Sequence, residues 1–345
     1  MNEGEKTLSD QAKATRLIDV AKEVGMSRAA VARVLLGTGA GRVRVSEASS
    51  KKIREAAKRL NYEPNEAARQ LKGKGRKTLA VVILDNAPPV VFDRICAMEK
   101  RAWEKGYEII LCRFPYQTED FITRLSNRKF DGLIVMDRIS KAQTLEKSNH
   151  EFEGIPTVFH SYAVATDDDY GVIPDVYEGT RIAAQHLADI GRKRIALVSL
   201  GMVNRIKAWR DSMIANNLPA DESLCLSVLY YRHRLNEQIA EKIIKEFVIN
   251  QKVDALLVEN DYWAARILQC LKSHDIRVPE DVAIVGYNNL DFSEFLVPAL
   301  TTIDEDNEAL GTALVDQLLL LIEGNKVENR QIKIQPKLII RKSTS

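Results

Sequence analysis

The sequence is poor in cysteine and histidine and has no long apolar run, and each shortage excludes a class of protein. Its 345 residues include 4 Cys and 5 His. The cysteines show no Cys-x-x-Cys spacing, so we expect reduced core thiols rather than a redox or metal centre; they are Cys96, Cys112, Cys225 and Cys270. No apolar run approaches the roughly 20 residues that span a bilayer. Residues 1–14 are polar and lack the apolar centre of a signal peptide, so we expect a cytoplasmic protein.

Motifs that build catalytic sites are also missing. The sequence contains no Gly-x-Ser-x-Gly elbow, no Walker loop and no His-Glu-x-x-His pair. His160 and His186 have no Cys or His partner at the spacing of metal ligands. We therefore expect neither an enzyme nor a bound cofactor or metal.

The net charge is small, but charge is unevenly distributed along the chain. The formal net charge is +2, yet residues 1–77 hold 18 Lys and Arg against 9 Asp and Glu, and the remainder holds 32 against 39. A basic N-terminal part on an acidic body is typical of proteins that contact nucleic acid phosphates. The alternative is a basic face that is merely solvated.

Helical periodicity begins at Thr15 and changes to short apolar runs after Lys77. We expect a mobile tail over residues 1–14, a helical domain over 15–62, a hinge helix and basic linker over 63–77, and a larger domain over 78–345. In the larger domain, apolar runs alternate with amphipathic helices, which predicts parallel sheets covered on both faces. The expected strands are 79–84, 107–112, 132–136, 157–160, 195–200, 255–258 and 283–286.

Two short periodic helices flank a Gly25-Met26 turn in the N-terminal part. The run from Thr15 to Leu35 reads TRLIDVAKEVGMSRAAVARVL. Ser27 stands where a helix N-cap belongs, because its hydroxyl can accept hydrogen bonds from free N–H groups of the first turn. The pattern predicts a helix-turn-helix, in which the second helix enters the DNA major groove.

With further motifs, the sequence resembles the lactose/galactose repressor (LacI/GalR) family of bacterial transcription regulators. The matches outside the helix-turn-helix include Leu60-Asn61-Tyr62, Pro64-Asn65, Phe130-Asp131-Gly132, Val278 to Tyr287, Pro298 to Thr302 and Leu338 to Thr344. The resemblance implies a helix-turn-helix head and a hinge helix joined to a two-lobed α/β effector domain of the periplasmic-binding-protein type. It also implies a homodimer on a near-palindromic operator.

The resemblance assigns DNA contacts to two segments. In the recognition helix, Arg28 and Ala29 occupy the positions that set operator preference, and Arg33 the arginine position used on bases. For Arg28, a phosphate contact without sequence information is the alternative. Leu71 resembles the hinge leucine that opens a base step in the minor groove, although a core role is its alternative. The expected DNA-binding residues are Thr15, Ser27, Arg28, Ala29, Arg33, Asn65, Ala68, Leu71 and Lys72.

The loop after the recognition helix departs from the family pattern. Residues 37–44 form a longer, glycine-rich stretch that ends in Arg42 and Arg44. We expect one of these arginines to contact a DNA phosphate, and a solvated loop without a DNA contact is an equal alternative.

The resemblance also implies an effector site between two lobes, but its residues depart from the sugar-binding pattern. The expected site residues are Val90, Ser161, Arg205, Asn260 and Asn288. Arg205 suits a hydroxyl or carboxylate, and an interlobe salt bridge is its alternative. Ser161 and Asn288 stand where sugar-binding members carry aspartate. The ligand is therefore an anionic metabolite, a sugar held differently, or absent. A regulator with a vestigial effector site, a solute receptor and an enzyme remain as rivals.

Overall fold

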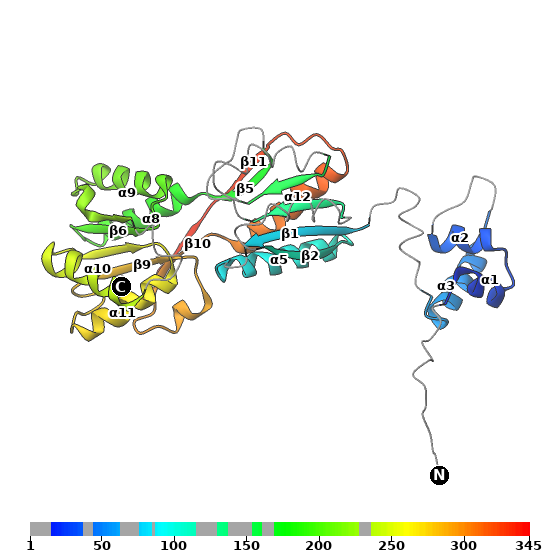
Figure 1. The fold of residues 1–345 in the computed structure, drawn as a ribbon, viewed down its shortest axis with the longest axis horizontal. Coiled ribbons are helices and arrows are strands. Elements are labelled where there is room, and N and C mark those ends of the chain that lie inside the picture. The colour runs from blue at the N-terminus through cyan, green and yellow to red at the C-terminus, as the bar shows by residue number, and fades with distance from the viewer. Residues whose placement is uncertain are drawn as a thin grey trace, which may run out of the picture. The chain divides into compact units, whose positions relative to one another are not determined.

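The computed structural model divides into two compact units, Met1–Arg76 and Lys77–Ser345, each described here by itself (Figure 1). The structure describes residues 15–36, 44–62, 76–84, 87–114, 130–136, 154–160, 169–227 and 236–345.

Three short helices form the described part of the first unit: α1 (Leu17–Val24), α2 (Arg28–Leu36) and α3 (Glu47–Arg59). Gly25 ends α1 with a φ of 66°, a left-handed conformation that glycine adopts without steric cost. Ser27 caps α2 by accepting from the Ala30 N–H at 3.2 Å, and Ser46 caps α3 by accepting from Ser49 N–H at the same distance. The expected helix-turn-helix is therefore confirmed. Its core consists of Val20, Ala21, Val24, Val31, Ile53, Ala56 and Ala57.

The second unit contains two mainly parallel sheets, each of which defines a lobe. The first lobe has the strand order β11-β5-β4-β3-β1-β2, and the second has β12-β10-β9-β8-β6-β7. The strands of the first sheet are β1 (Thr78–Leu84), β2 (Glu108–Phe114), β3 (Gly132–Val135), β4 (Thr157–Phe159), β5 (Gly171–Pro174) and β11 (Gln331–Ile334). Those of the second are β6 (Ile195–Ser199), β7 (Cys225–Ser227), β8 (Ala255–Val258), β9 (Ala283–Tyr287), β10 (Thr301–Asp304) and β12 (Lys337–Ile339).

Helices cover these sheets because the continuous apolar strands must be shielded from water. In the first lobe, α5 (Val90–Glu104) packs along α12 (Asn307–Ile322) over a core that includes Leu79, Val81 and Ile134. In the second lobe, α8 (Val176–Asp189) packs against α9 (Val203–Ala215), and α10 (Glu237–Ile243) against α11 (Asp261–Ser273). Short helical segments complete this lobe: η1 (Glu222–Leu224), the π-helix η2 (Ile244–Asn250) and η3 (Asp291–Glu294).

The chain crosses between the lobes at three places. It passes from β5 to α8, from β10 to α12 and from β11 to β12 (Figure 1). The first and third crossings are joined, because the Asp175 N–H donates to the Ile334 carbonyl at 3.0 Å. Side chains at the carboxyl ends of the strands therefore face the junction of the lobes.

All seven expected strands are present, but the sequence-based interpretation was incomplete. It missed the short strands β5, β7, β10, β11 and β12. Strand β12 pairs antiparallel with β10, so the second sheet is not wholly parallel. The expectation of four core thiols was wrong for Cys96, which is exposed on the outer face of α5; all four cysteines are free. Within the described ranges, no helix has the length and apolar character needed to cross a membrane.

Candidate functional site

The N-terminal part of α2 presents an exposed polar face. Ser27, Arg28, Ala29 and Arg33 are exposed, whereas Val31 on the same helix is fully buried. Residues four apart lie on one side of a helix, so Ala29 and Arg33 share a face. The structure therefore brings the expected recognition residues together on an accessible surface.

Thr15 takes part in the packing of the first unit. It is half-buried, and its hydroxyl donates to the Leu60 carbonyl at 2.8 Å, at the end of α3. Nearby, burial raises the pKa of the Tyr62 hydroxyl, and the charge of Arg28 opposes that rise. The ends of α3 and α2 are therefore close enough for their groups to interact.

Several expected site residues lie outside the described residues. These are Asn65, Ala68, Leu71 and Lys72 of the hinge, Arg42 of the glycine-rich loop and Ser161 of the effector site. Arg44, at the end of the same loop, is exposed.

Arg205 lies on α9 and is almost completely buried within the second lobe. Its Nε is 3.7 Å from Glu259 Oε2, and its guanidinium carbon lies 3.9 Å from the centroid of the Tyr287 ring. The same Glu259 oxygen accepts from the Ser199 hydroxyl at 2.8 Å and the Leu200 N–H at 2.9 Å. The ion pair described for Arg205 is internal to the second lobe, and the interlobe salt bridge considered as its alternative stays a prediction.

The other expected effector residues also have partners within the protein. The Asn260 side chain caps α11 by accepting from the Trp263 N–H at 3.0 Å. The Asn288 amide donates to Glu305 Oε2 at 3.0 Å. Val90 is the first residue of α5 and is buried. These side chains hold the local structure.

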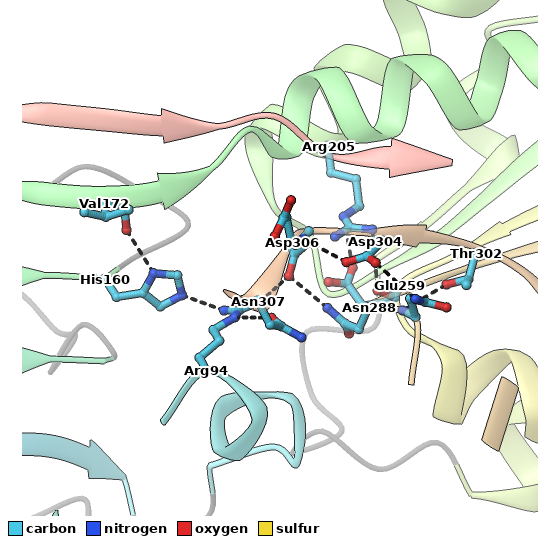
Figure 2. Close-up of polar contacts among 12 residues, drawn as sticks. Arg94, His160, Val172, Arg205, Glu259, Asn288, Thr302, Asp304, Asp306 and Asn307 are labelled. Atoms are coloured by element: carbon cyan, nitrogen blue, oxygen red, sulfur yellow. Dashed lines mark hydrogen bonds and ion pairs between the residues drawn. The ribbon is translucent and has the colours of Figure 1, made fainter. Parts of the chain in front are cut away.

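Arg94 is the centre of a buried polar group at the junction, which we call the interlobe cluster: Arg94, His160, Asn288, Glu305 and Asn307. Figure 2 labels Arg94, His160, Asn288 and Asn307 of this cluster. Its Nε donates to Asn307 Oδ1 at 2.8 Å, its Nη1 to His160 Nε2 at 2.5 Å, and its Nη2 to Glu305 Oε2. Arg94, His160 and Glu305 are at most 1% exposed. A buried guanidinium with a carboxylate partner is electrically balanced and well satisfied.

His160 is neutral in this cluster. Its Nδ1 lies 2.9 Å from the Val172 carbonyl, so Nδ1 carries the proton and Nε2 accepts from Arg94. Burial, together with the neighbouring Arg94 charge, lowers the pKa of His160 to about 3. His160 therefore adds no charge to the cluster near neutral pH, and the charges of Arg94 and Glu305 balance each other.

Asp261 organises the segment that follows β9. Its carboxylate accepts from the Leu290 N–H and the Ser293 hydroxyl at 2.8 Å, and from the Thr302 hydroxyl at 2.6 Å. Burial raises its pKa to about 6, and these hydrogen bonds oppose the rise. Asp261 thereby fixes the segment that carries Asn288.

Sequence reasoning missed Arg94, Glu259 and Glu305. One signal was available for Arg94, because it lies four residues from Val90 and Met98 on the apolar face of its helix. A charge in phase with an apolar stripe indicates a buried charge. Across the described ranges, no three His, Cys, Asp or Glu side chains gather as metal ligands would.

Two family models match this chain. The model described as bacterial regulatory proteins, lacI family, matches residues 16–65, and a periplasmic binding protein-like domain matches residues 184–344. Together they match a part of each unit and more than half of the sequence.

Known proteins with similar sequences match over nearly their whole length. The HTH-type transcriptional repressor PurR of Vibrio parahaemolyticus is 28% identical over 331 residues, covering 94% of this chain and 96% of the relative. The HTH-type transcriptional regulator DegA of Bacillus subtilis is 28% identical, covering 96% and 98%. A solved lac repressor dimer bound to operator and the anti-inducer ONPF has a TM-score of 0.76 at 25% identity, covering 96% and 99%.

The order of the two matched domains, the capped helix-turn-helix and the two-lobed α/β unit agree with these comparisons. This chain belongs to the lacI family of bacterial regulatory proteins.

Proposed function

We propose that this chain is a sequence-specific transcription regulator that represses by binding a near-palindromic operator as a homodimer in the cytoplasm. Its relatives include proteins described as transcriptional repressors and a lac repressor dimer bound to operator. A twofold dimer suits a twofold DNA site, because each head reads one half-site.

The exposed face of α2 carries this proposal. Arg28, Ala29 and Arg33 are accessible beside the capped N-terminus of the helix, while Val31 holds the helix in the core. Arginine can donate two hydrogen bonds to guanine O6 and N7, and alanine offers an apolar contact to a thymine methyl group. We assign base readout to Arg33, with Arg28 and Ala29 setting operator preference.

Selection of bound sequences from a random DNA pool tests the proposal directly. We expect a twofold-symmetric motif with a flexible pyrimidine–purine step at its centre. Enrichment of no common motif, at moderate salt and with a metabolite mixture present or absent, would contradict sequence-specific binding.

A pair of matched variants then tests the assigned face. Arg33→Ala is expected to reduce discrimination against a mutated half-site by about 1–3 kcal/mol. Arg54→Ala removes the same charge from an exposed position on α3 and serves as the control. If each variant weakens binding to the operator and to random DNA by the same factor, and this factor is the same for both variants, Arg33 contributes only its charge.

The residues Val90, Ser161, Arg205, Asn260 and Asn288 are proposed to face a small-molecule effector, a sugar or an anionic metabolite. A relative of known structure from Alkaliphilus metalliredigens, 26% identical over 78% of this chain with a TM-score of 0.64, is described as complexed with D-xylulofuranose. Strand ends that face each other across two lobes suit such a ligand.

One observation favours a second candidate, a DNA-binding regulator whose effector site is vestigial. Carboxylates of the chain already contact the polar groups of Arg205 and Asn288, through Glu259 and Glu305. A thermal-shift screen of sugars and anionic metabolites separates the candidates. A compound that raises the midpoint of thermal unfolding and changes operator affinity supports the effector-responsive regulator. If no compound in the screen does so, the vestigial site is supported.

A further inference from the structure

Glu305 lies where the chain crosses from the second lobe to the first. It follows β10 of the second lobe and precedes α12 of the first lobe by two residues. The side chain is fully buried. A carboxylate at this position can bond to groups of both lobes while its own backbone belongs to the crossing.

On the first-lobe side, the partner of Glu305 is Arg94 of α5. The other two guanidinium nitrogens of Arg94 are held by His160 and Asn307 (Figure 2). Because His160 is itself held by the Val172 carbonyl, the guanidinium has a fixed direction. The first lobe therefore offers Glu305 a rigid, charged partner.

On the second-lobe side, the same Oε2 atom of Glu305 accepts from the Asn288 amide at 3.0 Å. Asn288 directly follows β9 and has a φ of 96°, in the left-handed region. Asparagine is one of the few residues that enter this region readily. Its N–H donates to the Ile303 carbonyl at 2.8 Å, so its backbone is tied to the adjacent strand.

The residues on either side of Glu305 are also tied down. Asp304 Oδ2 accepts from the Asn289 amide at 3.1 Å, and Asp306 Oδ2 lies 3.0 Å from Lys337 Nζ at the start of β12. Asp306 has a φ of 59° and caps α12 through the Ala309 N–H at 3.0 Å. Three consecutive acids at one crossing thus each have a partner of their own.

We propose that Glu305 is a resident carboxylate that joins the lobes through Arg94 and Asn288 and so holds their arrangement without a bound effector. An anionic ligand that reaches this position competes with Glu305 for Arg94. The crossing is then the element on which an effector acts. The effect of this competition on DNA binding rests on the proposed function.

Asn288→Asp gives the sharpest test. The change keeps the size and the tolerance of a positive φ, but it removes the donor and places a second carboxylate beside Glu305. Asn289→Asp is the matched control, because its bond to Asp304 lies within the second lobe. Glu305→Gln is a second variant, which keeps an acceptor oxygen and removes the charge.

The measurement is a spin-label distance across the lobes in the full chain. Labels are placed on the exposed Cys96 and on Lys272→Cys of α11, with Cys225→Ser and dilution by unlabelled protein. We expect one narrow distance distribution without any metabolite, a broadened or shifted one for Asn288→Asp and Glu305→Gln, and the narrow one for Asn289→Asp.

Two results overturn the proposal: a broad distribution in the unmodified chain, or a distribution for Asn288→Asp that matches the control. Operator affinity is measured on the same samples, and Asn288→Asp is expected to change it at least fivefold. If the distance distribution changes and the operator affinity does not, the role of Glu305 in joining the lobes stands, and the coupling to DNA in the proposed function fails.

Discussion

Replacing Arg94 with methionine should strongly destabilise the second unit. Arg94→Met keeps an unbranched, apolar side chain in the space that the arginine stem occupies. It leaves Glu305 fully buried without its cationic partner. Breaking a buried pair in this way typically costs about 3–5 kcal/mol. For a domain of this size, that loss lowers the melting midpoint by about 6–20 °C.

Removing both charges should reverse most of the loss. In the double variant Arg94→Met/Glu305→Gln, no uncompensated charge is buried, and the glutamine oxygen can still accept from Asn288. Replacement of buried pairs by neutral groups is often close to neutral in stability. We therefore expect a coupling energy of about 2 kcal/mol or more in the double-mutant cycle.

Urea unfolding followed by tryptophan fluorescence isolates the relevant unit, because all three tryptophans (Trp103, Trp209 and Trp263) lie in it. The matched control is Arg101→Met, which breaks the Arg101–Asp316 pair between α5 and α12. That pair is partly exposed, so water screens it and the loss should be much smaller. The reasoning is refuted if Arg94→Met costs less than about 1 kcal/mol, or if the two single changes add without coupling.

Three further changes test other parts of the chain. Because the folded pKa of His160 is about 3, below its unfolded value of about 6.5, its contribution to the free energy of unfolding falls by up to about 1.4 kcal/mol for each pH unit by which the pH is lowered between those values; His160→Gln should remove this loss, so that urea titrations of the variant show stability rising as the pH falls from 6 to 4. Asp261, with a folded pKa of about 6, acts in the opposite direction between pH 6 and 4, so the unmodified protein should show a shallow dependence there. Gly311→Ala would place a methyl carbon 2.8 Å from the Arg94 carbonyl oxygen, and we expect a loss of about 1–3 kcal/mol in the same unfolding assay. Ser46→Ala removes the cap of α3 and should cost the first unit about 1 kcal/mol, measured by faster amide exchange in α3; unchanged exchange would show that the cap is dispensable.

The apolar pattern of the sequence was sufficient to predict most of the fold. Continuous apolar runs such as Leu79 to Ile83 are buried on both faces of a sheet, as is typical of the strands of a covered parallel sheet. The strands that were missed are three or four residues long. Strands β11 and β12 carry half-buried or exposed side chains, because each lies at the edge of its sheet, where fewer side chains need shielding.

The capped helices were equally predictable, because their signals are local. Ser27 and Ser46 each bond to an N–H three residues ahead, so the sequence contains both partners within one turn. The expected effector residues were found through a family pattern, but their partners were not. Arg205 and Glu259 are 54 positions apart, and no local spacing connects them.

The same argument explains why Arg94 and Glu305 escaped notice and why they matter. They are 211 positions apart and meet only because the chain crosses between lobes twice before it reaches α12. A buried arginine without a counter-charge would be too costly to keep, so its carboxylate must come either from the chain or from a ligand. In this chain it comes from the crossing itself. An effector that acts at this junction must therefore either displace Glu305 from Arg94 or leave that pair intact. Glu305→Gln should abolish the response in the first case and preserve it in the second.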